Sequence, residues 1–125
     1  MKKIYYLSSC STCQRILKDI NAPTHCTLQD IKTEAISEKE LDWLSSKTGS
    51  YETLFSRKAL KYRALGLHEK ILTENDYRDL ILQEYTFLKR PVFIVEEQVF
   101  IGNMAKTVAA AKAALSWIIL IEFVR

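Results

Sequence analysis

Two cysteines, Cys10 and Cys13, stand three positions apart near the start of the chain and are its best candidates for chemistry. A cysteine attacks as the thiolate, and the pKa of a free thiol, about 8.5, can fall to roughly 3.5–7.5 at a helix N-terminus or in a Cys-x-x-Cys pair. The spacing therefore indicates a reactive thiolate at Cys10. In the alternative interpretation, Cys10 is a small buried apolar residue and Cys13 is a helix residue packed beneath the loop.

The residues on either side of this pair predict where Cys10 lies. The apolar run Ile4–Leu7 is typical of a short strand, and Ile16, Leu17 and Ile20 recur at the spacing of a helix that buries one face. Cys10 then lies where the strand turns into the helix, beside backbone N–H groups that have no partner within the helix. This position favours the nucleophile over the buried thiol.

A second strand is predicted from Thr24 to Leu28, after Asn21–Pro23 ends the first helix. Two strands joined by a short helical crossover form a parallel pair. Cys26 falls in the middle of this segment, with no other thiol beside it in the sequence. We therefore interpret Cys26 as a core residue.

Three helices are predicted in the middle of the chain. Ser37–Glu40 has the pattern of a capping box, and its helix is expected to run to about Ser46. Leu54–Leu67 has helical spacing, basic polar positions and Gly66 as its stop. Thr73–Asp76 offers the third capped start. The apolar face of this third helix is formed by Tyr77, Leu80, Ile81 and Tyr85.

The last part of the chain predicts a hairpin followed by a helix. Val92–Val95 and Gln98–Ile101 are short apolar runs separated by two glutamates, as expected for a tight antiparallel hairpin. Asn103 can cap the Ala-rich helix that begins near Met104, and we expect the apolar run Trp117–Ile121 to pack against the sheet or a partner chain. The complete order of elements predicts an α/β protein with a thioredoxin-like fold, in which a four-stranded mixed sheet carries a helical insertion.

Size and composition narrow the class of protein. With 125 residues, of which 48% are hydrophobic, we expect a single domain over residues 1–125. The net charge of +3 is too mild to indicate direct nucleic-acid binding, and the apolar run near the C-terminus is much shorter than the ~20 residues that cross a membrane. An odd number of cysteines, three, and the absence of an apolar leader predict a reduced, cytoplasmic protein. His25 and His68 lack the paired spacing of zinc ligands, so we expect no metal.

Three stretches together carry a family resemblance. They are Cys10–Cys13 after the first strand, Leu54–Leu67 with the string Tyr-Arg-Ala-Leu-Gly-Leu at its end, and Lys89–Val92 before the hairpin. In this combination the chain resembles the arsenate reductase (ArsC) family of thioredoxin-fold proteins, which also contains the Spx-type transcription regulators. The resemblance spans nearly the whole chain and is more specific than the Cys-x-x-Cys motif alone.

The resemblance implies roles for individual residues. Cys10 corresponds to the family's nucleophile, Arg90 of the Arg-Pro pair lies beside it, and Pro91 is in a cis peptide bond facing the thiol. Cys13 lies one helical turn further on and can close a disulfide with Cys10 after the attack, as in Spx-type members and dithiol oxidoreductases. Ser11 and Thr12, between the cysteines, are expected to contribute to anion binding.

Two positions depart from the arsenate-specific members of the family. An ungapped match places Ser56 where those reductases have an arginine, and the next residues, Arg57 and Lys58, are the candidate anion-binding cations. Asn103 stands thirteen positions after Arg90, where those enzymes have a third arginine. Because each charge-assisted fork contributes both energy and geometry, we expect an oxyanion to bind less well here.

Two functions of different classes follow from these residues. The first is a thiol-dependent reductase of a small oxyanion or a disulfide, with no bound cofactor, to which glutathione, glutaredoxin or thioredoxin returns electrons. The second is an Spx-type redox-sensing regulator that binds RNA polymerase and uses Cys10 and Cys13 as a switch. An anion site with converging arginines distinguishes the two, since the regulator needs only the cysteines.

Overall fold

The structure is a computed structural model and describes residues 1–22 and 26–124, with side chains as far as residue 116. The chain divides into two compact units. Met1–Glu34 and Arg90–Arg125 form the first unit, and Ala35–Lys89 forms the second. The sheet and both chain ends therefore belong to the first unit, and the helical middle of the sequence forms the second.

A four-stranded mixed sheet organises the first unit. Its strands are β1 (Lys2–Tyr6), β2 (Thr27–Asp30), β3 (Val92–Val95) and β4 (Gln98–Ile101). The order is β2-β1-β3-β4; β1 and β2 are parallel, and the other two pairs are antiparallel. In this register Ile4 lies opposite Leu28 on one side and Phe93 on the other. The predicted fold class and the predicted hairpin are both confirmed.

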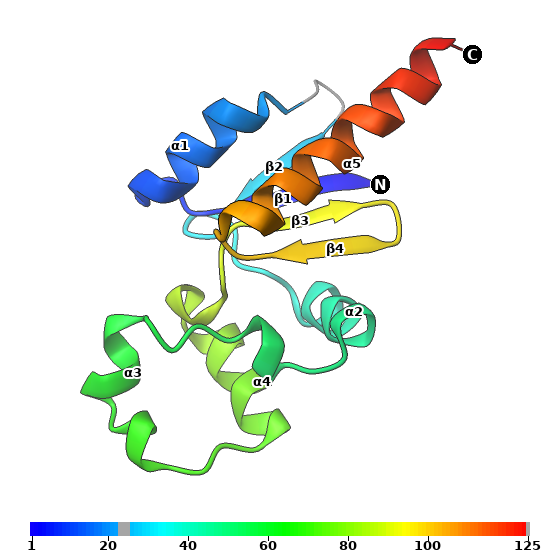
Figure 1. Cartoon of the computed structure of the whole chain (residues 1–125). Coiled ribbons are helices and arrows are strands. Elements are labelled where there is room, and N and C mark those ends of the chain that lie inside the picture. The colour runs from blue at the N-terminus through cyan, green and yellow to red at the C-terminus, as the bar shows by residue number, and fades with distance from the viewer. Residues whose placement is uncertain (23–25, 125) are drawn as a thin grey trace. The chain divides into compact units, whose positions relative to one another are not determined.

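Helices α1 (Ser11–Ile20) and α5 (Ala105–Val124) cover one face of this sheet (Figure 1). Each helix packs there because its apolar residues recur at helical spacing and so lie on one side, which faces the strands. An ion pair between Lys112 and Asp19, 3.3 Å long, joins the two helices. The shared core of helices and sheet consists of Ile4, Ile16, Ile20, Cys26, Phe93, Val95, Val108, Ala111 and Leu115.

Two capped helices form the second unit's framework. In α2 (Glu38–Thr48) the Ser37 hydroxyl accepts the Glu40 N–H while the Glu40 carboxylate accepts the Ser37 N–H, and this capping box confirms the sequence prediction. Helix α4 (Glu74–Gln83) begins with an equivalent box between Thr73 and Asp76. Helix α2, which Ser37 caps, continues two residues beyond the expected end at Ser46 and stops before Gly49, which has φ +99°.

Contacts between side chains join the elements of this second unit. Arg78 on α4 forks onto Asp42 on α2 with distances of 2.8 and 3.2 Å, and the Tyr51 hydroxyl donates to the same carboxylate at 2.6 Å. The ring of Phe55 is fully buried and contacts three other aromatic rings, at centroid distances of 4.9 to 5.9 Å. These rings belong to Tyr62, Tyr77 and Phe87.

The prediction of one helix over Leu54–Leu67 is wrong. The segment begins at the end of the 3-10 turn η1 (Glu52–Leu54), contains the five-residue helix α3 (Leu60–Ala64) and ends at the start of the turn η2 (Leu67–Glu69). Phe55 is extended and pairs with Leu88, and backbone hydrogen bonds from Ser56 to Phe87 and from Lys89 to Leu54 accompany this bridge. Those bonds use backbone groups that a continuous helix would need.

Several predicted boundaries also need correction. Strand β2 begins at Thr27, which pairs with Lys3, and continues to Asp30. Cys26 is buried but precedes the strand. Leu28 is 47% exposed. The predicted residues Thr24 and His25, with Pro23, lie outside the described residues. Helix α5 begins at Ala105, so Met104 directly precedes it and Asn103 is one residue too early to be its cap.

The predicted apolar face of the third helix is too long by one residue, and the packing predicted near the C-terminus falls outside the described side chains. Tyr85 lies in the turn η3 (Tyr85–Phe87), past the end of α4, and so does not continue its apolar face. The packing predicted for Trp117–Ile121 concerns side chains outside the described ones. Among the described residues, none of the helices combines the length and the apolar character needed to cross a membrane.

Phe55 offers a test of the second unit's packing. Replacing a fully buried phenylalanine by alanine typically costs about 3–5 kcal/mol, so Phe55→Ala is expected to lower the free energy of unfolding by about that much. The matched control is Leu60→Ala, because Leu60 is 91% exposed and its loss is expected to change stability by less than about 0.5 kcal/mol. Urea denaturation measures both, and equal effects of the two changes would contradict the observed packing.

Candidate active site

Cys10 is the N-cap residue of α1. Its backbone is extended, with φ −93° and ψ 114°, its N–H donates to the Leu7 carbonyl at 3.0 Å, and its own carbonyl accepts the Gln14 N–H at 3.1 Å. A side chain at this position faces the backbone N–H groups at the start of the helix. The Cys10 thiol makes no close capping hydrogen bond, but it is partly exposed and lies where those N–H groups can stabilise a negative charge.

The surroundings of Cys10 lower the pKa of its thiol. Partial burial by itself raises this pKa, but the interactions with the thiolate outweigh it. They come from the backbone N–H and the thiol of Cys13, the guanidinium of Arg90 and the backbone N–H of Thr12. Cys10 is therefore the thiol of the motif that ionises first.

Arg90 reaches this thiol because of the strand register. Tyr5 of β1 lies opposite Val92 of β3 in an antiparallel pair, so the residues just before β3 and those just after β1 meet at the same end of the sheet. Arg90 stands two residues before Val92, and the loop to Cys10 follows β1. The Arg90–Pro91 peptide bond is cis, the conformation that the resemblance implied.

Cys13 is in the opposite electrostatic situation. It is fully buried in the first turn of α1. This burial, together with the negative charge of Cys10, raises the pKa of Cys13 to about 11. A hydrogen bond with the Leu7 backbone lowers this pKa but is outweighed. The motif thus holds one thiol that ionises readily and one that stays protonated and donates to it. Burial also raises the pKa of Cys26, which belongs to the sheet core.

The remaining predicted site residues fall into two groups. Ser11 and Thr12 begin α1, where Ser11 is exposed and Thr12 presents its N–H to Cys10. Arg57 and Lys58 belong to the second unit. Arg57 donates to Glu52 at 2.6 Å and to the Tyr77 hydroxyl at 2.9 Å, whereas Lys58 is exposed.

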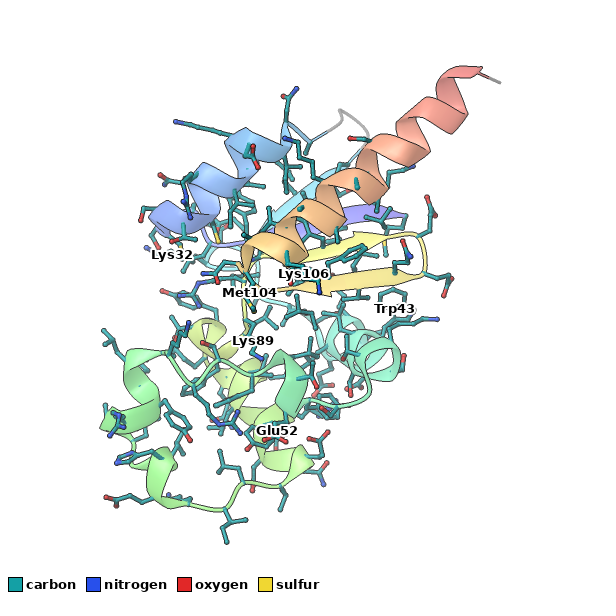
Figure 2. All side chains as sticks on the ribbon, in the orientation of Figure 1. Lys32, Trp43, Glu52, Lys89, Met104 and Lys106 are labelled. Carbon is teal, nitrogen blue, oxygen red and sulfur yellow. The ribbon has the colours of Figure 1, made fainter. Side chains whose placement is uncertain are left out.

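The environment of Arg57 bears on its predicted role. The hydrogen bond to Glu52 raises the pKa of Arg57, and the guanidinium also lies over the Tyr77 ring, 5.6 Å from its centroid. Figure 2 labels Glu52 in this unit. The charge that the sequence offered for an anion is therefore already compensated by a carboxylate. Asn103, at the position where a third arginine is expected in the arsenate-specific members, is exposed.

Sequence reasoning missed three residues around the loop that carries Cys10. The Ser8 N–H donates to the Asp30 carboxylate at 3.2 Å, and the Gln14 amide donates to the Ser8 carbonyl at 2.5 Å. An aspartate at the end of a strand is a frequent acceptor for backbone N–H groups in the turn that follows, and this was the available signal. Its partner Ser8 is 22 positions away, so the pairing itself had no local signature.

The described residues offer no cluster of three or more His, Cys, Asp or Glu side chains that could hold a metal ion, and His25 is not among them. The groups that the structure brings together at Cys10 are the Cys13 thiol, the Arg90 guanidinium and backbone N–H groups. These groups together can stabilise an anionic sulfur and a negatively charged reaction partner.

Solved structures with the same fold include several named for arsenate reduction. The arsenate reductase of Vibrio cholerae is 20% identical with a TM-score of 0.70, covering 88% of this chain and 96% of that one. An arsenate reductase (ArsC) related protein of Brucella melitensis is 23% identical with a TM-score of 0.67, covering 87% of this chain and 92% of that one. A possible arsenate reductase of Streptococcus mutans is 27% identical with a TM-score of 0.61, covering 79% and 87%. No curated protein matches the chain.

A family model extends this likeness from fold to sequence. The model of the ArsC family matches residues 5–111, a range that includes the Cys10–Cys13 motif, the whole second unit, Arg90 and the hairpin. The match covers far more than half of the 125 residues. The chain therefore belongs to the ArsC family.

Proposed function

We propose that the protein is a thiol-dependent reductase in which Cys10 is the nucleophile. The observation that carries the proposal is the environment of one sulfur: the N–H groups at the start of α1, the Cys13 thiol and the Arg90 guanidinium all act to ionise Cys10. A thiolate that is partly exposed and has a lowered pKa is the form that attacks an electrophile. Membership of the ArsC family supports the same reaction class.

The reaction on a mixed disulfide would take two steps. The Cys10 thiolate attacks one sulfur of the substrate, and the other sulfur leaves as a thiolate. Cys13 then loses its proton and attacks the Cys10 sulfur, so that an internal disulfide forms and the second substrate thiol departs. Once Cys10 carries an adduct it is no longer negatively charged, which removes one of the causes that raise the pKa of Cys13.

The same residues would act on an oxyanion such as arsenate, the substrate that the names of the structural relatives suggest. The Cys10 sulfur bonds to arsenic while one oxygen leaves as water. Cys13 then attacks the Cys10 sulfur, and the electron pair of the sulfur–arsenic bond leaves with the arsenic, which is reduced from As(V) to As(III). In either reaction a thiol donor, glutathione, glutaredoxin or thioredoxin, supplies the two electrons that reopen the disulfide.

Arg90 would have two tasks in this scheme. It stabilises the thiolate before the attack, and it is placed to bind negative charge on the substrate or the leaving group. Arg57 is paired with Glu52, and Asn103 stands where the arsenate-specific members are expected to have a third arginine. We therefore propose a disulfide as the better substrate and arsenate as the weaker one.

A redox-sensing regulator is the second candidate. The compensated charge of Arg57 favours it, because a regulator of the Spx type needs the two cysteines but no converging arginines. Cys10 and Cys13 would then act as a switch that is read by RNA polymerase. The proposal of a reductase keeps priority, because a guanidinium beside the nucleophile serves turnover directly.

The pKa of Cys10 can be measured from the rate of alkylation by iodoacetamide against pH, in a Cys26→Ser background. The expected midpoint lies below the ordinary thiol value of about 8.5, because Arg90 and the helix N–H groups stabilise the thiolate. Arg90→Met removes the guanidinium and is expected to raise the midpoint, so that alkylation at neutral pH slows. An ordinary midpoint in the unsubstituted protein would count against both candidate functions.

Turnover separates the two candidates. NADPH consumption, coupled through glutaredoxin or thioredoxin, is measured with arsenate and with a mixed glutathione disulfide. Cys10→Ser is expected to abolish it, and Arg90→Ala to lower kcat/KM by about 10²–10³-fold. Arg15→Ala is the matched control, because Arg15 is an exposed arginine on α1. Absence of turnover with every acceptor, together with retention on an RNA polymerase column, would support the regulator.

The role of Cys13 is visible in the intermediate. After one equivalent of oxidised glutathione is added, the unsubstituted protein is expected to end as the internal disulfide, and Cys13→Ser to accumulate Cys10 bonded to glutathione. Intact-mass spectrometry distinguishes these species. If the Cys13→Ser protein releases glutathione as fast as the unsubstituted one, Cys13 does not resolve the adduct and is only a packed helix residue.

A further inference from the structure

Ser8, which stands two positions before Cys10 in the loop between β1 and α1, links this loop to other elements. Its N–H donates to an oxygen of Asp30 at 3.2 Å, and its hydroxyl also interacts with this carboxylate. On its other side, the Ser8 carbonyl accepts the amide of Gln14, which lies one helical turn after Cys10 on α1. Ser8 is thus fixed to β2 and to α1 at the same time.

Asp30 is itself firmly placed. It is the last residue of β2 and lies opposite Tyr6 in the parallel ladder, and the next residue, Ile31, donates its N–H to the Tyr6 carbonyl at 2.9 Å. The Lys32 N–H donates to the same carboxylate oxygen as Ser8, also at 3.2 Å. Figure 2 shows Lys32 in this turn after β2. The Asp30 carboxylate therefore connects the loop to the sheet, because Asp30 is fixed in β2 and accepts the Ser8 N–H.

These contacts favour the ionised form of the Asp30 carboxyl. The Ser8 hydroxyl is the main cause that lowers the pKa of this carboxyl and exceeds the opposing effect of burial, and the N–H groups of Ser8 and Lys32 lower the pKa further. The groups that lower the pKa of Cys10 are different ones, namely Cys13, Arg90 and Thr12. A negative charge close to Cys10 would raise the pKa of its thiol. If Asp30 favours the Cys10 thiolate, it therefore does so through geometry and not through its charge.

We propose that Asp30 is a positioning residue for Cys10: through Ser8 it holds the loop so that the Cys10 sulfur faces the N–H groups of α1 and the Arg90 guanidinium. For catalysis the inference rests on the proposed function, whereas for the ionisation of Cys10 it does not. Gln14 supports the same loop from the helix side. The arrangement matters because charge stabilisation at short range depends steeply on distance and direction.

Two substitutions separate position from charge. Asp30→Ala removes the acceptor for Ser8 and Lys32, whereas Asp30→Asn keeps an acceptor oxygen at nearly the same place and removes only the charge. Asp19→Ala is the control, because Asp19 is an exposed carboxylate of the same unit whose contact is with Lys112 on α5. Ser8→Ala, which removes only the hydroxyl, serves as a further variant if Asp30→Ala does not fold.

The measurement is the pH dependence of Cys10 alkylation by iodoacetamide in the Cys26→Ser protein, with no substrate present. Asp30→Ala is expected to raise the midpoint pH and to slow alkylation at neutral pH, with Ser8→Ala shifting it in the same direction. Asp30→Asn is expected to stay close to the unsubstituted protein, as is Asp19→Ala. Where turnover is found, kcat/KM of Asp30→Ala is expected to fall roughly 10–100-fold.

Other outcomes overturn the proposal. If Asp30→Ala unfolds more easily in urea but keeps the alkylation midpoint of the unsubstituted protein, Asp30 is only a structural residue. If Asp30→Asn and Asp30→Ala both lower the midpoint, the direct effect of the charge dominates. Because alkylation needs no substrate, a protein without turnover would contradict the proposed function and still leave this inference fully tested.

Discussion

The candidate site is organised around one negative charge, that of the Cys10 sulfur. A sulfur anion at this place is stabilised by N–H groups without helical partners, which the start of α1 provides, and by a cation, which Arg90 provides. The antiparallel pairing of β1 with β3 brings these two together, although 80 positions separate them in the chain. The sheet order is therefore what makes the site, since the same motif on an isolated helix would lack the guanidinium.

The difference between Cys10 and Cys13 follows from the geometry of a helix start. A residue at the N-cap lies at the surface end of the first turn, whereas the residue three positions later points back beneath it and, in this chain, into the core. Burial penalises a thiolate at Cys13, and the charge on Cys10 adds repulsion. The positions of the two thiols thus make them differ in ionisation, and in the proposed reaction this difference assigns the attack to Cys10 and the resolution to Cys13.

The local parts of this arrangement could be predicted from the sequence, and the long-range parts could not. The capping boxes at Ser37 and Thr73 and the hairpin after Pro91 depend on residues a few positions apart, so their patterns were readable. Leu54–Leu67 has helical spacing but lies largely outside a helix, because the buried Phe55 pairs with Leu88. Similarly, nothing near Asp30 in the sequence indicates Ser8 as its partner.

The same distinction between local and long-range contacts bears on the proposed choice of substrate. A basic residue read from a motif counts as a potential anion ligand, but its value depends on which carboxylates the fold brings to it. Glu52 stands five positions before Arg57 and takes up its charge, with the Tyr77 ring beside it. A tetrahedral oxyanion gains most from several converging guanidiniums, whereas the departing sulfur of a disulfide is a single anionic atom. One arginine beside a thiolate therefore suits thiol–disulfide exchange better than the binding of arsenate.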